Sequence, residues 1–175
     1  MHIQSEAAPG SVLIKPGVKN LRGLLDYIET ATGKALDKEH VRMMNPLVLA
    51  YIGDTVYDLF VRTYLIHVHD VPVHQLHIKS ISYVKAESQS ETLYQIDEQL
   101  TEEEKDIVRR GRNAKSGTIP KNADVADYRR ATGFESLLGF LYLTRQEERL
   151  CQLIGYMLAA KADQNQSAKA GKPEN

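Results

Sequence analysis

Residues 45–67, NPLVLAYIGDTVYDLFVRTYLIH, form the most apolar segment of this sequence and decide its fold class. Asn45 followed by Pro46 is a strong start signal for a helix. The asparagine side chain caps free N–H groups, and a proline at the first helical position has no N–H to leave unpaired. Apolar residues then recur at helical spacing from Leu47 to about His67. The segment therefore predicts a long helix at the centre of the protein.

Helical periodicity also extends over most of the remaining sequence. A helix is predicted from Val18 until Thr32-Gly33 breaks the pattern, and Thr101 followed by Glu104 forms a capping box at the start of another. No segment alternates as a strand does, so the predicted fold class is all-α. The predicted C-terminal helices cover about 73–98, 101–110, a segment beginning near 124, and 146–161.

The composition is that of one globular domain. The chain has 175 residues, of which 42% are hydrophobic and 26% charged, and a chain of this length can bury a stable core. A single cysteine excludes a disulfide scaffold, and no apolar run is long enough to predict a membrane helix or a secretory segment. The sequence therefore predicts a cytoplasmic protein that has no membrane partner.

Several residues with chemically active side chains are interpreted as core residues. Tyr51, Tyr57 and Tyr142 lie at core spacings, which predicts packing with a hydrogen-bonded hydroxyl. Cys151 lies among leucines and an isoleucine, where a thiol usually fills space. A cysteine nucleophile is therefore not expected.

Two acidic residues stand out because each lies in an apolar helical segment close to a glycine. Asp54 follows Gly53, and Glu135 lies in FESLLG, residues 134–139. Glycine costs a helix about 1 kcal/mol relative to alanine, and it leaves room for another group to approach the backbone. A carboxylate in this setting needs a partner. The residues leave two partners open: a shared divalent ion such as Mg²⁺, which one or two carboxylates can bind, or arginines such as Arg62.

Charge is unevenly distributed, although the formal net charge is only −1. Eight acidic residues and one lysine lie in 87–106, whereas seven basic and two acidic residues lie in 107–131. The basic part contains GRNAKSGTIPKN, residues 111–122, whose glycines, proline and small polar residues predict a loop. Such a loop can bind phosphates through N–H and guanidinium groups, or it can be an ordinary solvated surface. The candidate RNA-binding residues are Arg109, Arg110, Arg112, Lys115 and Lys121.

Three motifs, in this order along the chain, resemble parts of one enzyme family. LAYIGDTVYD, residues 49–58, resembles the signature helix of the ribonuclease III family, and FESLLGFLYL, residues 134–143, resembles its second acidic helix. Between them, RGRNAKSGTIPKNADVADYR, residues 110–129, is similar to the short bacterial branch called Mini-III ribonuclease. Smaller matches to that branch are Leu76-His77 and Ser88-Gln89.

The resemblance implies a ribonuclease III-type helical fold and a catalytic domain over residues 36–161. Outside it, we expect residues 1–17 to form a flexible arm and residues 18–35 an additional helix. Residues 162–175 are expected to be a disordered polar tail.

The same resemblance implies roles for the two embedded acids. Asp54 corresponds to the metal-binding aspartate of the signature helix and Glu135 to the glutamate of the second motif, so both are expected to be catalytic and to bind Mg²⁺. Ala50 and Thr132 stand where longer relatives carry a glutamate and an aspartate. The short branch shares these losses, which leave the ion with fewer protein ligands and more water.

Two other acids have roles that the sequence leaves open. Asp58, one turn after Asp54, either contributes to the metal site through water or pairs with a base. Glu87 stands where a lysine is expected in this branch, which puts a substrate contact there in doubt.

The implied substrate is double-stranded RNA, and the implied assembly is a homodimer, because cutting both strands requires two active sites. No double-stranded-RNA-binding domain follows the catalytic region, so the catalytic domain is expected to hold the RNA through its basic loop. By resemblance, the natural target is precursor ribosomal RNA of the 23S type.

Two alternatives compete with this hypothesis. A non-catalytic RNA-binding or ribosome-associated module would use the same acids structurally. A helical His-Asp phosphohydrolase is suggested by His69-Asp70, but Val71-Pro72 forces that pair into a turn, whereas such a site needs it on a helix.

Overall fold

The computed structural model describes residues 21–115, 124–156 and 158. Every regular element within these ranges is a helix, which confirms the predicted all-α class. The chain divides after Leu36 into two compact units. The first contains α1 (Leu21–Thr32), and Gly33 follows it with a positive φ of 66°, as the predicted helix break requires.

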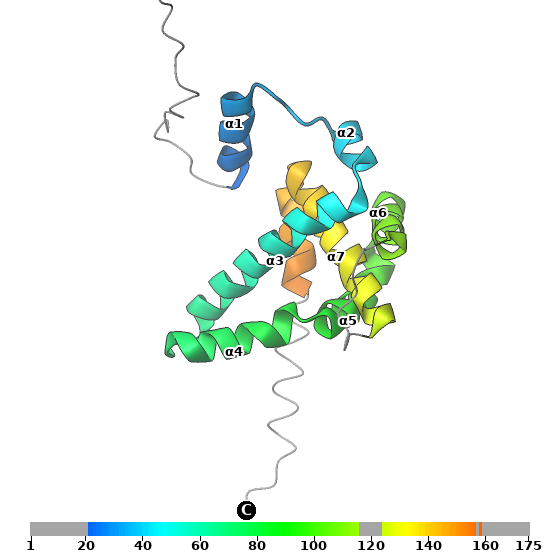
Figure 1. The fold of residues 1–175 in the computed structure, drawn as a ribbon. Helices are drawn as coiled ribbons and strands as arrows, with labels where there is room; N and C mark the ends of the chain where they lie inside the picture. Colours follow the sequence, from blue (N-terminus) through cyan, green and yellow to red (C-terminus); the bar gives the residue numbers. More distant parts are fainter. Residues whose placement is uncertain (1–20, 116–123, 157, 159–175) are drawn as a thin grey trace, which may run out of the picture. The chain divides into compact units, whose positions relative to one another are not determined.

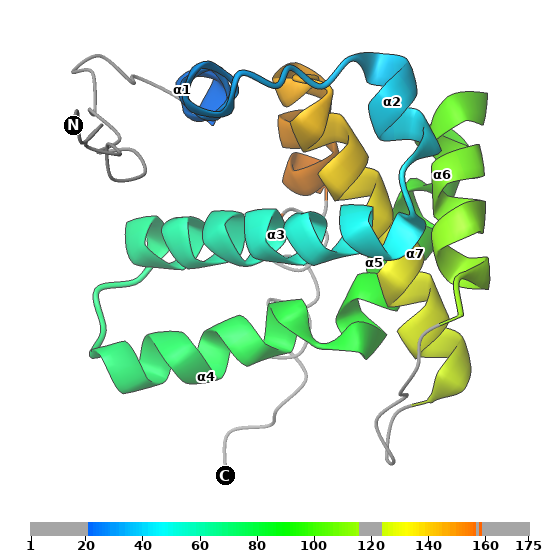
Figure 2. The same cartoon turned by 45° about the horizontal axis from the view of Figure 1, so that its top comes forward.

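The second unit is a bundle of helices in which α3 and α7 cross (Figures 1 and 2). None of the helices in the described ranges is long and apolar enough to span a bilayer. The helices of this unit are α2 (Lys38–Met43), α3 (Pro46–Val68), α4 (Val73–Val84), α5 (Ala86–Ile96), η1 (Asp97–Gln99), α6 (Glu102–Asn113), α7 (Val125–Leu143) and a helix over 147–156.

Local capping signals define where the long helices begin. The Asn45 side chain accepts a hydrogen bond from the Leu47 N–H at 3.0 Å, and Pro46 is the first residue of α3, as predicted. At α6, the Thr101 hydroxyl accepts from the Glu104 N–H at 3.3 Å, while the Glu104 carboxylate accepts from the Thr101 N–H at 2.8 Å. The predicted capping box is therefore confirmed.

Helix α7 lies at the centre of the core. Its buried residues include Phe134, Leu137, Leu138 and Phe140, and it packs against α3, α5 and α6. The Tyr57 ring of α3 meets the Phe134 ring edge-on, with centroids 5.4 Å apart. The side chains around Glu135 are therefore fixed by close packing on several sides.

Glycines bring α3 and α7 into direct backbone contact. A Cβ atom on Gly53 would lie 1.8 Å from the carbonyl oxygen of Glu135, and one on Gly139 would lie 2.0 Å from the carbonyl oxygen of Leu49. Real side chains essentially never approach backbone atoms so closely, so only glycine allows this crossing. The crossing places the residue after Gly53, which is Asp54, beside Glu135.

Two predicted boundaries were wrong. The helix predicted over 73–98 is two helices, because Lys85 is extended at ψ 146° and the Ser88 hydroxyl donates to the Ser82 carbonyl across the break. The loop predicted to begin at Gly111 is still helix through Asn113. Gly111 is needed there because a Cβ atom would lie 2.7 Å from the Cα of Gly133 on α7.

Two predictions of core packing were also wrong. Tyr57 and Tyr142 are buried as predicted, but Tyr51 has 80% of its surface exposed. Cys151 is exposed as well. Both lie on helices with another face buried, so apolar neighbours in the sequence do not share their environment.

Candidate active site

Asp54 reaches the surface where α3 crosses α7. Its side chain is exposed, and the buried Gly53 before it touches the α7 backbone. Partial burial raises the pKa of the Asp54 carboxyl above its usual value, and the nearby charge of Asp58 raises it further. Asp54 has no ion pair with any base among the described residues.

Glu135 projects from α7 toward Asp54 and is more deeply buried. Burial raises the pKa of its carboxyl to about 8, and the neighbouring Asp54 adds to the rise. The backbone contact between Gly53 and Glu135 places both carboxyls at the same helix crossing, where the charge of one acts on the pKa of the other. The structure therefore brings the two predicted acids together, on two helices far apart in sequence.

Gln89 of α5 is a third member of this site, and it was not among the predicted site residues. The side chain is 1% exposed, and its amide lies near Glu135, whose pKa it acts to lower. Neither amide atom meets hydrogen-bond geometry with a described residue. A buried amide usually has partners, so its unused donors and acceptor beside a carboxyl indicate a polar group that completes the site. The match of Ser88-Gln89 to the Mini-III branch is the sequence signal for this residue.

The donor set suits a hard cation with few protein ligands. Asp54 and Glu135 supply carboxylate oxygens, and no group of three or more His, Cys, Asp or Glu side chains gathers within the described ranges. Mg²⁺ keeps several waters and binds proteins through one or two carboxylates, so two acids without a basic partner in that part of the chain fit it. Ala50 is buried one turn before Asp54, and the Thr132 hydroxyl donates to the Tyr128 carbonyl.

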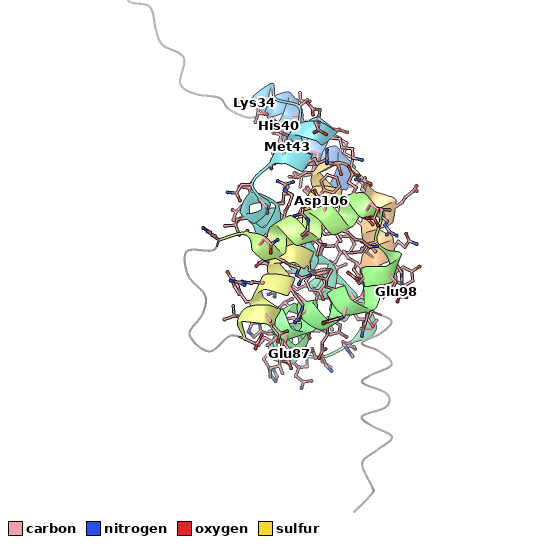
Figure 3. All side chains as sticks on the ribbon, turned by 90° about the vertical axis from the view of Figure 1, so that its right-hand side faces the viewer. Lys34, His40, Met43, Glu87, Glu98 and Asp106 are labelled. Atoms are coloured by element: carbon pink, nitrogen blue, oxygen red, sulfur yellow. The ribbon has the colours of Figure 1, made fainter. Side chains whose placement is uncertain are left out.

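Asp58 lies near Asp54, whose pKa its charge raises, but it has a basic partner of its own. The Asp58 carboxylate accepts a hydrogen bond from the Arg62 Nε at 2.6 Å. The sequence left open whether Asp58 contributes to the metal site through water or pairs with a base, and the structure shows an ion pair with Arg62. Glu87 forms an ion pair with Lys85 at 2.5 Å at the surface. Figure 3 shows Glu87 at the edge of the bundle.

The predicted RNA-binding residues have different surroundings. Arg110 donates from its two terminal nitrogens to the carbonyl oxygens of Arg42 and Met44, which holds the end of α2. Arg109 pairs with Asp106, which Figure 3 labels on α6. Lys121 lies outside the described residues. Arg112 and Lys115 are exposed and have no hydrogen bond or ion pair within the described part of the chain.

The histidine-aspartate pair lies outside the helices. His69 caps the end of α3, and Asp70 lies in the four-residue connection to α4. The prediction that this pair does not lie on a helix is therefore confirmed, which leaves no helical His-Asp site at these two residues.

Comparison with known proteins gives consistent matches. The model of the Ribonuclease III domain matches residues 47–146, which include Asp54 and Glu135. The chain is 49% identical over 136 residues to a Mini-ribonuclease 3 of Thermoanaerobacter, covering 78% of this chain and 92% of that protein. It is 46% identical to a Mini-ribonuclease 3 of Clostridium tetani, covering 79% and 94%.

A solved structure agrees in fold. A crystal structure of a Fusobacterium nucleatum protein superposes with a TM-score of 0.63 at 30% identity, covering 69% of this chain and 97% of that one. The family match covers more than half of the chain, and it includes both acids of the α3–α7 crossing. This chain therefore belongs to the ribonuclease III family, in its Mini-ribonuclease 3 branch, and is an endoribonuclease.

Proposed function

We propose that this endoribonuclease is Mg²⁺-dependent, cuts both strands of double-stranded RNA as a homodimer, and matures precursor ribosomal RNA of the 23S type in the cytoplasm. The observation that carries the proposal is the facing pair Asp54 and Glu135, which has no basic partner among the described residues. A purely structural pair of acids would be expected to pair with arginines. The choice of ribosomal RNA rests on the family resemblance.

The two acids have distinct roles in this proposal. Asp54 and Glu135 would hold Mg²⁺, which would supply a water of lowered pKa and neutralise the charge that grows on the scissile phosphate. Asp54, on the exposed side, holds the ion where RNA can reach it. Glu135 must release its proton when the ion binds, because burial beside Asp54 keeps its pKa near 8. No histidine base is required.

Basic residues close to the site support an RNA substrate. Arg112 and Lys115, at and just after the end of α6, are exposed and make no ion pair with other described residues. Arg130, which is half-buried and paired with Asp127, lies about 1.4 turns before Glu135 on α7. Exposed guanidinium and ammonium groups bind phosphates directly. Arg110 is not counted among these phosphate-binding residues, because its terminal nitrogens already donate to backbone carbonyls at the end of α2.

An exposed apolar stripe along α3 supports the homodimer. Val48, Tyr51, Leu59 and Ile66 are all exposed, and at about 100° per residue they fall within one arc of the helix. A pocket of about 440 Å³ between α3 and α4, lined mainly by apolar atoms, lies at the Ile66 end of the stripe. Exposed apolar surface of this kind is typical of protein interfaces. A two-fold axis across the stripe would place two acid pairs in one assembly.

The test replaces Asp54 with asparagine, which keeps the volume and removes the negative charge. Asp54→Asn is expected to reduce cleavage of a duplex in Mg²⁺ to background, with the melting temperature and RNA affinity nearly unchanged. Asp58→Asn is the matched control, because Asp58 pairs with Arg62, and we expect it to retain most activity.

Mapping the RNA ends by sequencing gives the second readout. Paired, staggered cuts in a ribosomal RNA precursor stem support the proposed substrate. Cleavage by the Asp54→Asn variant at the wild-type rate would contradict the metal assignment. It would also favour the alternative in which the acids are structural and the protein acts by binding RNA.

A further inference from the structure

A small polar notch lies on the α5–α7 side of the protein, apart from the two acids. It has a volume of about 140 Å³. That volume fits one nucleobase and is too small for a base pair. The notch is lined by Leu93, Tyr94, Asp97, Arg112 and Arg130. We call it the Arg130 notch.

One wall of the Arg130 notch is an aromatic platform. The Arg130 guanidinium lies over the Tyr94 ring, 5.0 Å from its centroid. Arg130 is held in place by Asp127 at 3.3 Å and by the Ser90 hydroxyl at 3.4 Å. Tyr94 is nevertheless 68% exposed, which is unusual for a ring of this size. A fixed guanidinium on one face of an exposed ring leaves the rest of the ring free to stack with another planar group.

Two other polar groups line the notch without using their hydrogen-bonding capacity on neighbours. The carboxylate of Asp97 and the guanidinium of Arg112 make no ion pair or hydrogen bond with the residues that the structure describes. Both line the same small volume. The notch therefore offers two acceptor oxygens on Asp97 and a fork of donors on Arg112.

The position of the notch places it within reach of RNA at the active site. Arg130 precedes Glu135 by five residues on α7, a rise of about 7.5 Å and a turn of about 140° around the helix. Two adjacent residues of α5 contact these two residues of α7. Gln89 lies beside Glu135, and the next residue, Ser90, accepts a hydrogen bond from Arg130. A nucleotide a step or two from the scissile phosphate would therefore reach the notch.

We propose that the Arg130 notch binds one unpaired guanine of the RNA substrate. Asp97 accepts hydrogen bonds from the guanine N1–H and N2 amino group, Arg112 donates to O6 and N7, and Tyr94 stacks on the ring. The proposal rests on the endoribonuclease function, because it requires RNA to lie across Asp54 and Glu135.

The donor and acceptor pattern selects guanine over the other bases. Guanine presents two adjacent donors on its Watson–Crick edge and two adjacent acceptors on its Hoogsteen side. Adenine and cytosine place a donor next to an acceptor, and uracil has a single donor between two acceptors. A carboxylate and an arginine fork can therefore both be satisfied only by guanine.

The test measures binding to duplexes that carry one bulged nucleotide, placed in turn at each position on both sides of the cut. Affinity is measured by fluorescence anisotropy with the Asp54→Asn protein, which is expected to hold RNA uncut. The bulged base is guanine, adenine, inosine or 7-deazaguanine. Inosine lacks the N2 amino group, and 7-deazaguanine lacks the N7 acceptor. At one bulge position, guanine is expected to bind at least about fivefold more tightly than each of the others.

Second-site variants assign each edge to its residue. Adding Asp97→Asn should abolish the loss of affinity that inosine shows relative to guanine, and should keep the loss that 7-deazaguanine shows. Adding Arg112→Gln should abolish the loss for 7-deazaguanine and keep the loss for inosine. Glu98→Gln is the control, because Glu98, which Figure 3 labels, lies on the same short helix as Asp97, loses the same charge on substitution and is not among the residues that line the notch. It should keep both penalties.

The outcomes separate this proposal from the function on which it rests. Equal affinity for all bases at every position, or penalties that Asp97→Asn and Arg112→Gln leave unchanged, would overturn the guanine site. Duplex cleavage by the wild-type protein would then still stand. If the wild-type protein cuts no duplex in Mg²⁺, the proposed function fails, whatever the base preference.

Discussion

At the scale of single residues, Glu135 combines a proposed catalytic role with a cost to stability. Its carboxyl has a pKa near 8 in the folded protein, against an ordinary value of 4.5. Between these two pH values the unfolded chain has lost this proton and the folded chain retains it. Folding therefore takes up a proton, and this group makes the free energy of unfolding fall as pH rises from 4.5 to 8. Above pH 8 the destabilising contribution of Glu135 to the free energy of unfolding is constant.

Glu135→Gln is expected to stabilise the protein at pH 8 without divalent ions, because the neutral amide has no proton to lose. An increase of at least about 3 °C in melting temperature corresponds to about 1 kcal/mol for a chain of this size. At about pH 4, below the ordinary carboxyl value of 4.5, the two proteins should melt within a degree or so of each other. Calorimetry at both pH values measures the difference. Equal melting temperatures at the higher pH would mean that Glu135 ionises freely.

Gln89 is predicted to serve the site and to add little to stability. Its buried amide lies beside Glu135 but does not meet strict hydrogen-bond geometry, so Gln89→Leu removes a poorly satisfied polar group and keeps a side chain of similar size. We expect an unchanged or higher melting temperature and a Mg²⁺ requirement raised about tenfold, as for other groups that orient metal ligands. Titration of cleavage against Mg²⁺ and direct Mn²⁺ binding provide the readouts. A large loss of stability would instead make Gln89 a structural residue.

At the scale of helices, the crossing of α3 and α7 decides where the two acids meet. Gly53 and Gly139 bring the helix backbones into contact, and any side chain at Gly53 would overlap the Glu135 carbonyl. Helix α2 is fixed in another way, by the Arg110 donors on its last carbonyl groups. Arg110→Ala would therefore report on stability as well as on RNA binding. Arg112 and Lys115 are the cleaner residues for measuring contacts with RNA.

Gly53→Ala is expected to separate α3 from α7 and to misplace Asp54, with a loss of several kcal/mol and of activity. Gly155→Ala is the matched control, because a Cβ atom added to this helical glycine would meet no neighbouring atom within 4 Å. Alanine there should stabilise the helix by up to about 1 kcal/mol. Chemical denaturation of both variants measures the difference. A Gly53→Ala protein as stable and active as the parent would show that the helices do not need this contact.

At the scale of the whole molecule, the exposed stripe of α3 connects assembly to catalysis. Tyr51 is the most exposed residue of the stripe, and Asp54 lies only about 60° further around the same helix. A second copy packed on the stripe would therefore bring two acid pairs to the edges of one interface. This geometry relates the proposed dimer to the cutting of two strands.

The assembled protein should sediment at about twice the chain mass of 19.7 kDa. Tyr51→Glu is expected to yield a monomer, because a charge within an apolar interface is costly to bury. Val125→Glu is the control, since Val125 is an exposed apolar residue at the start of α7, where an acid is well tolerated. Analytical ultracentrifugation distinguishes the two. A Tyr51→Glu monomer that still makes paired cuts would contradict the need for a dimer.

The sequence by itself determined the all-α class, the starts of α3, α6 and α7, and the choice of Asp54 and Glu135. Helix caps such as Asn45 and the Thr101–Glu104 box act over two or three residues, so a local pattern is sufficient to predict them. The sequence indicates Asp54 and Glu135 as candidate site residues because each interrupts an apolar segment close to a glycine. That they face each other remained an inference until the α3–α7 crossing was known.

Only the tertiary structure decided which neighbours share an environment. Tyr57 is buried and Tyr51 is exposed on the same apolar helix, because burial depends on which face meets α7. Arg110 and Arg112 are two residues apart, yet one holds α2 and the other has no partner within the described residues. Gln89 joins the acids through the packing of α5 on α7. These contacts join residues distant in the sequence, and no local spacing records them, because the helix crossing that creates them is fixed by the packing of the whole core.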